Sequence, residues 1–194
     1  MKLSTLTIQH KNWLDNSEAG GQIDLKSLTL DAEQIRTAVL EGAIFDYITF
    51  ERLEAFDCDF TGASFFNCTF ISCKLIHCNF HKAEFHDCRF DHIQITGCSF
   101  TKSEWHRGEF RLAVFASCDF SWSYLQSVDL RHTHFNDINL EGAIWDRNKL
   151  YKASFKSITL GSLHTARIER TDFSQDGNGG TWLTFEQFRE VFRI

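Results

Sequence analysis

The stretch CDFTGASFFNCTFISCKLIHCNF, residues 58–80, decides the fold because its cysteines, and all of its phenylalanines except Phe66, keep one spacing. Its cysteines, Cys58, Cys68, Cys73 and Cys78, lie five or ten residues apart. Zinc sites built from two close cysteine pairs usually leave two residues between ligands. The spacing therefore disfavours such a site and raises the question of which structure repeats every five residues.

The five-residue spacing extends far beyond this stretch. All seven cysteines stand at positions ending in 3 or 8. Two places further on, the 28 positions from 25 to 160 in steps of five hold 14 Phe, 9 Leu, 2 Ile and 2 Trp, and only Ala55 departs. An α-helix repeats every 3.6 residues and a strand every two, so neither produces this pattern by itself. The period indicates a repeat architecture, a larger coil with five residues per side.

Single units carry a resemblance to a known family. Ala63-Ser64-Phe65-Phe66-Asn67, Cys78-Asn79-Phe80-His81-Lys82 and Ala153-Ser154-Phe155-Lys156-Ser157 resemble the units of pentapeptide repeat proteins. The resemblance covers residues 23–175. It implies an all-β fold, a right-handed quadrilateral parallel β-helix in which four units make one turn. It also implies that the central Phe or Leu and the small residue two places before it point inward.

The small inward position holds 7 Cys, 7 Ala and 5 Ile among its 28 sites. A free cysteine behaves as a small hydrophobe and suits a closely packed interior. With twenty residues per turn, Cys58, Cys78, Cys98 and Cys118 stack at about the 4.8 Å spacing of neighbouring strands. We predict that they fill the core and bind no metal. Disulfides between turns fit the distance, but the odd count and the lack of a secretory signal in residues 1–9 favour a reducing cytoplasm.

Both ends of the coil are expected to be capped, which divides the chain into three parts. Residues 1–22 predict a cap made of a short strand, LSTLTI at 3–8, and a polar loop. The repeats occupy 23–175, with a register shift near Gly161 and Ser162 after which Leu163, Ile168 and Phe173 continue. Residues 176–194 predict a loop and an amphipathic helix, with Thr184 as N-cap. The apolar stripe of this helix is expected to cap the last coil and form a homodimer: Trp182, Phe185, Phe188, Val191 and Phe192.

The outward positions must carry the function because the inward ones are committed to packing. The net charge is −6, so nucleic acid is not the expected partner. No apolar run is long enough to span a membrane. One face mixes basic and acidic side chains. The candidate partner-binding residues are acidic on two other faces (Asp46, Glu84, Asp87, Glu104, Asp59, Asp119) and apolar on a fourth (Phe56, Ile76).

Catalysis has little support in this pattern. His86 and His106, expected one turn apart beside Glu84 and Glu104, make the best acid–base or metal cluster. They stand on the outside of a rod, whereas acid–base chemistry needs a pocket and an oriented partner. We therefore expect no enzyme activity, no cofactor and no metal.

Two function classes remain. The first is a general protein-binding scaffold that uses the surface around Phe56 and Ile76. The second follows from the family resemblance, which implies a dimeric DNA mimic that binds DNA gyrase or topoisomerase IV and protects it from quinolones or a peptide toxin. The mixed-charge face and the lack of a projecting insertion within residues 23–160 count against the second class.

Overall fold

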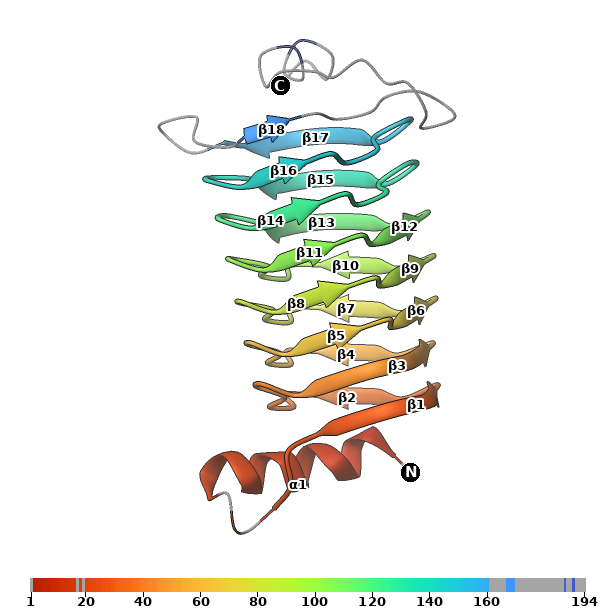
Figure 1. Ribbon diagram of the computed structural model, residues 1–194, viewed down its shortest axis with the longest axis vertical. Helices are drawn as coiled ribbons and strands as arrows, with labels where there is room; N and C mark the ends of the chain where they lie inside the picture. Colours follow the sequence, from red (N-terminus) through yellow and green to blue (C-terminus); the bar gives the residue numbers. More distant parts are fainter. Residues whose placement is uncertain are drawn as a thin grey trace.

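The computed structural model describes residues 2–16, 18, 20–160, 167–169, 187 and 190. One helix, α1 (Leu3–Asp15), precedes a stack of strands (Figure 1). The strands are β1 (Asp24–Asp31), β2 (Gln34–Arg36), β3 (Ile44–Glu51), β4 (Glu54–Phe56), β5 (Ser64–Phe66), β6 (Thr69–Ile71), β7 (Lys74–Ile76), β8 (Glu84–His86), β9 (Arg89–Asp91), β10 (Gln94–Thr96), β11 (Glu104–His106), β12 (Glu109–Arg111), β13 (Val114–Asp119), β14 (Tyr124–Gln126), β15 (His134–Asn139), β16 (Ile144–Asp146), β17 (Ser154–Thr159) and β18 (Arg167–Glu169).

The strands form a parallel β-solenoid in which each strand pairs with one from the next turn. Phe45 pairs with Phe65, and Phe65 with Phe85, so one turn takes twenty residues. One sheet contains seven strands, one per turn, in the order β17-β15-β13-β10-β7-β4-β2. The other contains eleven, including β3, β5, β8, β11, β14 and β16. The predicted all-β coil with four five-residue units per turn is therefore present as about seven parallel turns.

A left-handed residue stands at every corner between units. Each fifth residue from Ser27 to Ser157 has a φ between 49° and 65°, and only four of these residues are glycines. A non-glycine residue in this conformation costs about 1–2 kcal/mol. The corner N–H groups bond to the next turn, as Arg52 N does to the carbonyl of Ile71 at 2.8 Å. The hydrogen bonds between turns thus hold the backbone in a conformation that the residue types do not favour.

The core confirms the two predicted inward positions. The large residues stack on their counterparts one turn away, with the ring centroids of Phe65 and Phe85 4.8 Å apart and their planes 3° from parallel. Ala55, the exception in the sequence pattern, is fully buried as well. Close stacking of identical rings fills the interior efficiently, which explains why Phe dominates these sites.

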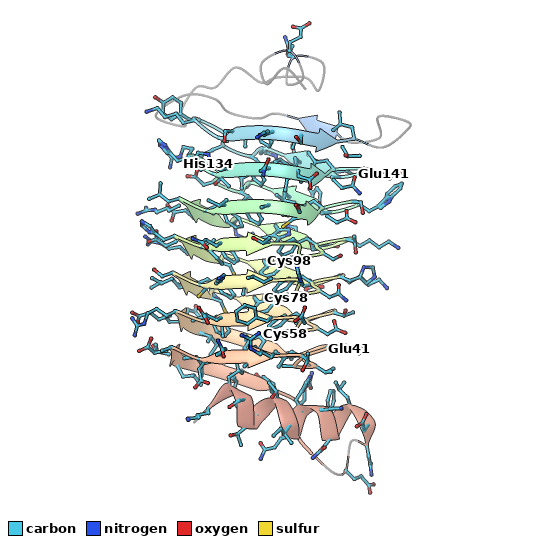
Figure 2. The ribbon with its side chains drawn as sticks, turned by 180° about the vertical axis from the view of Figure 1, so that it is seen from behind. Glu41, Cys58, Cys78, Cys98, His134 and Glu141 are labelled. Carbon is cyan, nitrogen blue, oxygen red and sulfur yellow. The ribbon has the colours of Figure 1, made fainter. Side chains whose placement is uncertain are left out.

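All seven cysteines are buried and free. Cys58, Cys78 and Cys98 lie one above the other along the rod (Figure 2). Their thiols point at backbone carbonyls, as Cys73 Sγ does at the carbonyl oxygen of Phe50, 3.2 Å away. Burial raises the pKa of Cys73 to about 11. The cysteines therefore serve as small core residues with weak hydrogen bonds.

The N-terminal strand prediction is wrong, because Leu3–Asp15 forms helix α1. Leu3 and His10 are fully buried and Leu6 packs on the core, so the inward residues follow helical spacing. The short window LSTLTI contains two Thr and one Ile, residues that favour strands only weakly. Packing of α1 across the open end of the first turn overrides that preference (Figure 1).

The predicted register shift is confirmed where the structure describes it. Trp145 pairs with Ile168, 23 residues further on, so this turn is three residues longer than the others. Gly161, Ser162, Leu163 and Phe173 lie outside the described residues. So do the cap and dimerisation candidates Trp182, Phe185, Phe188, Val191 and Phe192. Within the predicted C-terminal helix the structure describes Gln187 and Glu190, both helical and exposed.

Candidate interaction surfaces

Four outward faces follow from the four units of each turn. The β8 face carries the outward residues of β5, β8, β11, β14 and β16, of residues 44–46 in β3, and of the corners that follow these strands. The β9 face carries those of β6, β9, β12 and residues 129–131. The β10 face is the seven-stranded sheet. The bridge face contains isolated bridges that connect Asp59, Asn79, Ser99 and Asp119 in sequence. Each predicted partner-binding residue belongs to one of these faces.

The β8 face carries an aromatic column that sequence reasoning recognised only in part. The rings of His86 and His106 stack at 4.8 Å, and Phe66 stacks on His86 at 5.2 Å. Glu84 pairs in register with Glu104, as predicted. Each of these carboxylates lies beside the imidazole Nε2 of its own strand, 3.7 Å away in β8 and 3.5 Å away in β11. The column could be found in the sequence once the twenty-residue register was applied.

The two other acidic candidates of the β8 face, Asp87 and Asp46, are less accessible to a binding partner. Asp87 accepts two hydrogen bonds from Arg107, at 2.8 Å from Nε and 2.7 Å from Nη2. The same Arg107 guanidinium lowers the pKa of Asp87. Asp46 is half-buried, between Lys26 and Phe66 in the strand register. The face therefore presents exposed negative charge mainly at Glu84 and Glu104.

The two acidic candidates on the bridge face support the local turns. Asp59 Oδ1 accepts hydrogen bonds from the backbone N–H of Thr61 at 3.0 Å and from its hydroxyl at 2.6 Å. Asn79 donates to the same carboxylate at 3.2 Å. Asp119 accepts from the backbone N–H of Ser121 at 2.8 Å. These carboxylates complete turns between units, as aspartates commonly do.

The β10 face contains the two apolar candidates. Phe56 pairs in register with Ile76, and both are half-buried. The guanidinium of Arg36 lies 4.0 Å from the centroid of the Phe56 ring and covers part of it. This cation–π contact was absent from the predictions, although Arg36 stands one turn before Phe56.

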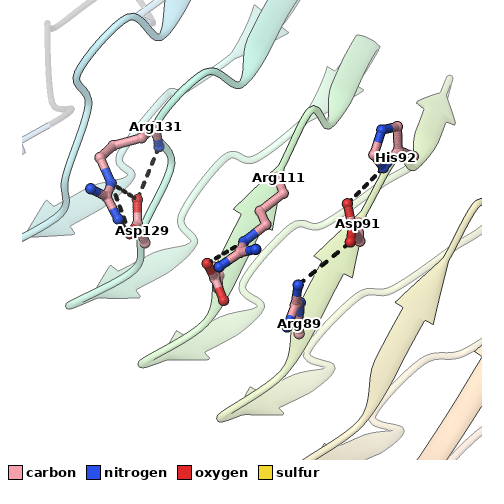
Figure 3. A network of polar contacts seen from close by, with 7 residues as sticks. Arg89, Asp91, His92, Arg111, Asp129 and Arg131 are labelled. Atoms are coloured by element: carbon pink, nitrogen blue, oxygen red, sulfur yellow. Dashed lines mark hydrogen bonds and ion pairs between the residues drawn. The ribbon is translucent and has the colours of Figure 1, made fainter. Parts of the chain in front are cut away.

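Opposite charges on the β9 face pair within one five-residue unit, in β9, in β12 and at residues 129–131 (Figure 3). The ion pairs are Arg89–Asp91 at 3.5 Å, Arg111–Glu109 at 2.6 Å and Arg131–Asp129 at 2.5 Å. His92 lies 2.7 Å from the other oxygen of Asp91. The predicted mixed-charge face is thus locally neutralised at these turns.

Two concave sites on the described part of the surface are open to solvent. One open depression of about 550 Å³ lies beside the ion pairs of the β9 face and includes the exposed Leu112, and another of about 730 Å³ lies at the corner toward the β10 face, lined by Arg52, Glu54 and Lys74. Among the described residues, no group of three or more His, Cys, Asp or Glu side chains is arranged to hold a metal ion. In the described part of the chain no helix has the length and apolar character needed to cross a membrane.

The fold and its surfaces define a class, a parallel β-solenoid built from five-residue units with four outward faces. The comparison with protein families agrees, because residues 63–145 match the model described as pentapeptide repeat region. Residues 63–145 of the chain are therefore a pentapeptide repeat region.

Several solved structures resemble this one. QnrB1, described as a plasmid-mediated fluoroquinolone resistance protein, in a trypsin-treated form is 23% identical, with a TM-score of 0.41 over 77% of this chain and 73% of that one. HetL, a pentapeptide repeat protein from the cyanobacterium Nostoc sp. strain PCC 7120, is 12% identical, with a TM-score of 0.27 over 88% of this chain and 97% of that one. Rfr23 from the cyanobacterium Cyanothece 51142 is 7% identical, with a TM-score of 0.35 over 86% and 99%. No curated protein sequence matches the chain.

Proposed function

We propose that this protein is a non-enzymatic scaffold that binds a protein partner on the β10 face and uses no cofactor. The observation that carries the proposal is the column Phe56, Ile76, Thr96 and Ala116, which is uncharged over four consecutive turns. Val114, beside it, is 38% exposed. Uncharged, partly apolar patches flanked by polar residues are typical of protein-binding surfaces.

Charge pairing elsewhere supports this choice of face. The ion pairs of the β9 face and the Asp87–Arg107 pair already satisfy much of the surface charge within the chain. A partner that approached those faces would have to break or share existing pairs, at a desolvation cost. The uncharged side chains of the β10 column can lose their water without breaking an ion pair.

A matched pair of isoleucines tests the proposal. Ile76 on the β10 face and Ile71 on the β9 face occupy the same place in neighbouring units, and both are half-buried. Partners captured from cells by the wild-type protein are identified and their affinities measured. Ile76→Asp should weaken binding at least tenfold while Ile71→Asp leaves it within twofold. Equal effects of the two variants would remove the β10 face from consideration.

A second candidate function is supported by the exposed, in-register Glu84 and Glu104 and by the net charge of −6. In this proposal the chain imitates DNA, binds DNA gyrase or topoisomerase IV and protects the enzyme from quinolones or a peptide toxin. Attraction to a basic DNA-binding surface weakens as salt rises. Supercoiling by purified gyrase, with and without a quinolone, is the test. Glu84→Lys with Glu104→Lys should abolish any effect, and Ile76→Asp should preserve it.

The proposal has three finer parts. The coil is right-handed and has a quadrilateral cross-section, and the four units per turn support the quadrilateral outline. The protein works in the cytoplasm, which suits its free thiols. It forms a homodimer through residues 181–194. Light scattering on the full chain and on a chain that lacks these residues tests the dimer: a full-length monomer would contradict it.

A further inference from the structure

His10 connects helix α1 to the first turn of the solenoid through both ring nitrogens. The backbone N–H of Ile23, where the first turn begins, donates to His10 Nδ1 at 3.0 Å. His10 Nε2 lies 2.9 Å from the carbonyl oxygen of Glu41. The side chain is fully buried, and its ring stacks on Trp13 at 5.5 Å. A single imidazole thus joins α1 to two separate points of the coil.

These contacts require one neutral form of the ring. Since Ile23 N–H is a donor, Nδ1 must accept, and Nε2 must carry the hydrogen that it donates to Glu41. A second proton would have to go on Nδ1. It would replace an acceptor with a donor that faces the N–H of Ile23, inside a buried site. Protonation of His10 therefore destabilises the closed position of α1.

The surroundings of His10 favour the neutral ring. Burial lowers the pKa of His10, and the Glu41 backbone and carboxylate raise it by less. The other charged groups on the elements beside it are Asp24, Lys26, Asp31, Arg36, Lys2, Lys11 and Asp15. Because the folded pKa lies below the value of about 6.5 for free histidine, the closed form is fully stabilised above that pH and loses stability as the pH falls below it.

We propose that His10 is a proton-sensitive latch that holds α1 over the open end of the solenoid at neutral pH and releases it in mild acid. Release would uncover the edge of the first turn, where β1 and β2 each pair with only one strand. Such edges are sites of pairing with other chains. Among the described residues, the histidines of the outward faces have no comparable role, because their contacts involve partly exposed side chains.

Hydrogen exchange on the full chain tests the latch. Protection factors of α1 amides are measured from pH 7.5 to 5.0, after correction for intrinsic exchange, with amides of the central turns as an internal reference. One proton taken up on opening should reduce α1 protection by about tenfold per pH unit below about pH 6.5, until the folded pKa is reached. The central turns should not change. Constant α1 protection across this range would overturn the proposal.

Two variants and a second measurement separate the latch from general acid sensitivity. His10→Gln keeps one donor and one acceptor but does not titrate, so α1 protection should become independent of pH. His134→Gln changes an exposed histidine whose Nδ1 lies 2.7 Å from Ser154 Oγ, and it should retain the wild-type profile. If His10→Gln opens at every pH, NMR of the wild-type imidazole decides. The ring must show the Nε2–H form at pH 7.5 and titrate where α1 opens, and a mismatch would overturn the proposal.

Discussion

Two buried serines on the same side of the core should respond oppositely to replacement by alanine. Ser103 Oγ accepts a hydrogen bond from the indole Nε1 of Trp105 at 2.8 Å and donates to the carbonyl of Phe100 at 2.7 Å. Ser123 occupies the same position one turn later, but its hydroxyl has no partner among the described residues. Ser103→Ala leaves a buried indole N–H unpaired, whereas Ser123→Ala removes an unpaired hydroxyl.

The magnitude follows from these contacts. An unsatisfied buried donor costs about 1–3 kcal/mol, so Ser103→Ala should lower the free energy of unfolding by that amount. The carbonyl of Phe100 keeps the backbone N–H of Ser103, 3.1 Å away, and adds little to the loss. Ser123→Ala should be neutral or stabilise the fold by up to about 1 kcal/mol.

Urea unfolding followed by circular dichroism measures both variants, provided that the denaturant slope stays constant. Thermal unfolding gives a second scale, with about 2–4 °C per kcal/mol for a chain of this size. Equal losses for the two serines would refute the reasoning, since they would show that side-chain volume and not the indole hydrogen bond decides the effect.

Three further predictions concern the core, the corners and the surface. Cys78→Ala should cost about 1–2 kcal/mol, and the thiols should react with a disulfide reagent only on unfolding; one bound zinc per chain by elemental analysis would contradict this. Gly62→Ala should cost about 1 kcal/mol in chemical unfolding, because φ is 62° and alanine is strained in this conformation. A Cβ there would meet no atom within 4 Å, so no steric clash adds to this cost. An unchanged stability would show that the corner tolerates alanine. The carboxyl of Asp87 should titrate by NMR below the usual aspartate range and return to it in Arg107→Ala; because the pKa is lowered, the pair stabilises the fold above that range and loses its effect as the pH falls.

The repeat and its two inward positions could be predicted from the sequence alone. The five-residue spacing of Phe and Leu, with small residues two places earlier, has no explanation in a helix or a single strand, so the period itself identified a solenoid. The same five-residue spacing located the register shift that the pairing of Ile168 confirms. It also placed Glu84 next to Glu104, and Phe56 next to Ile76, on neighbouring turns. Such features are local and repeat many times, so each unit reinforces the assignment.

Only the tertiary structure decided the features that occur once or depend on neighbours twenty residues away. Residues 3–15 became helix α1 because packing over the first turn outweighs a weak strand preference. His10 found its partners at Ile23 and Glu41 through that docking. The left-handed corners arise where hydrogen bonds between turns override residue preference. The carboxylate of Asp87 is less accessible to a binding partner because Arg107 from the next turn donates a hydrogen bond to it. A periodic pattern specifies which side chains point inward, but the contacts made by the outward side chains depend on distances that exist only once the turns have stacked.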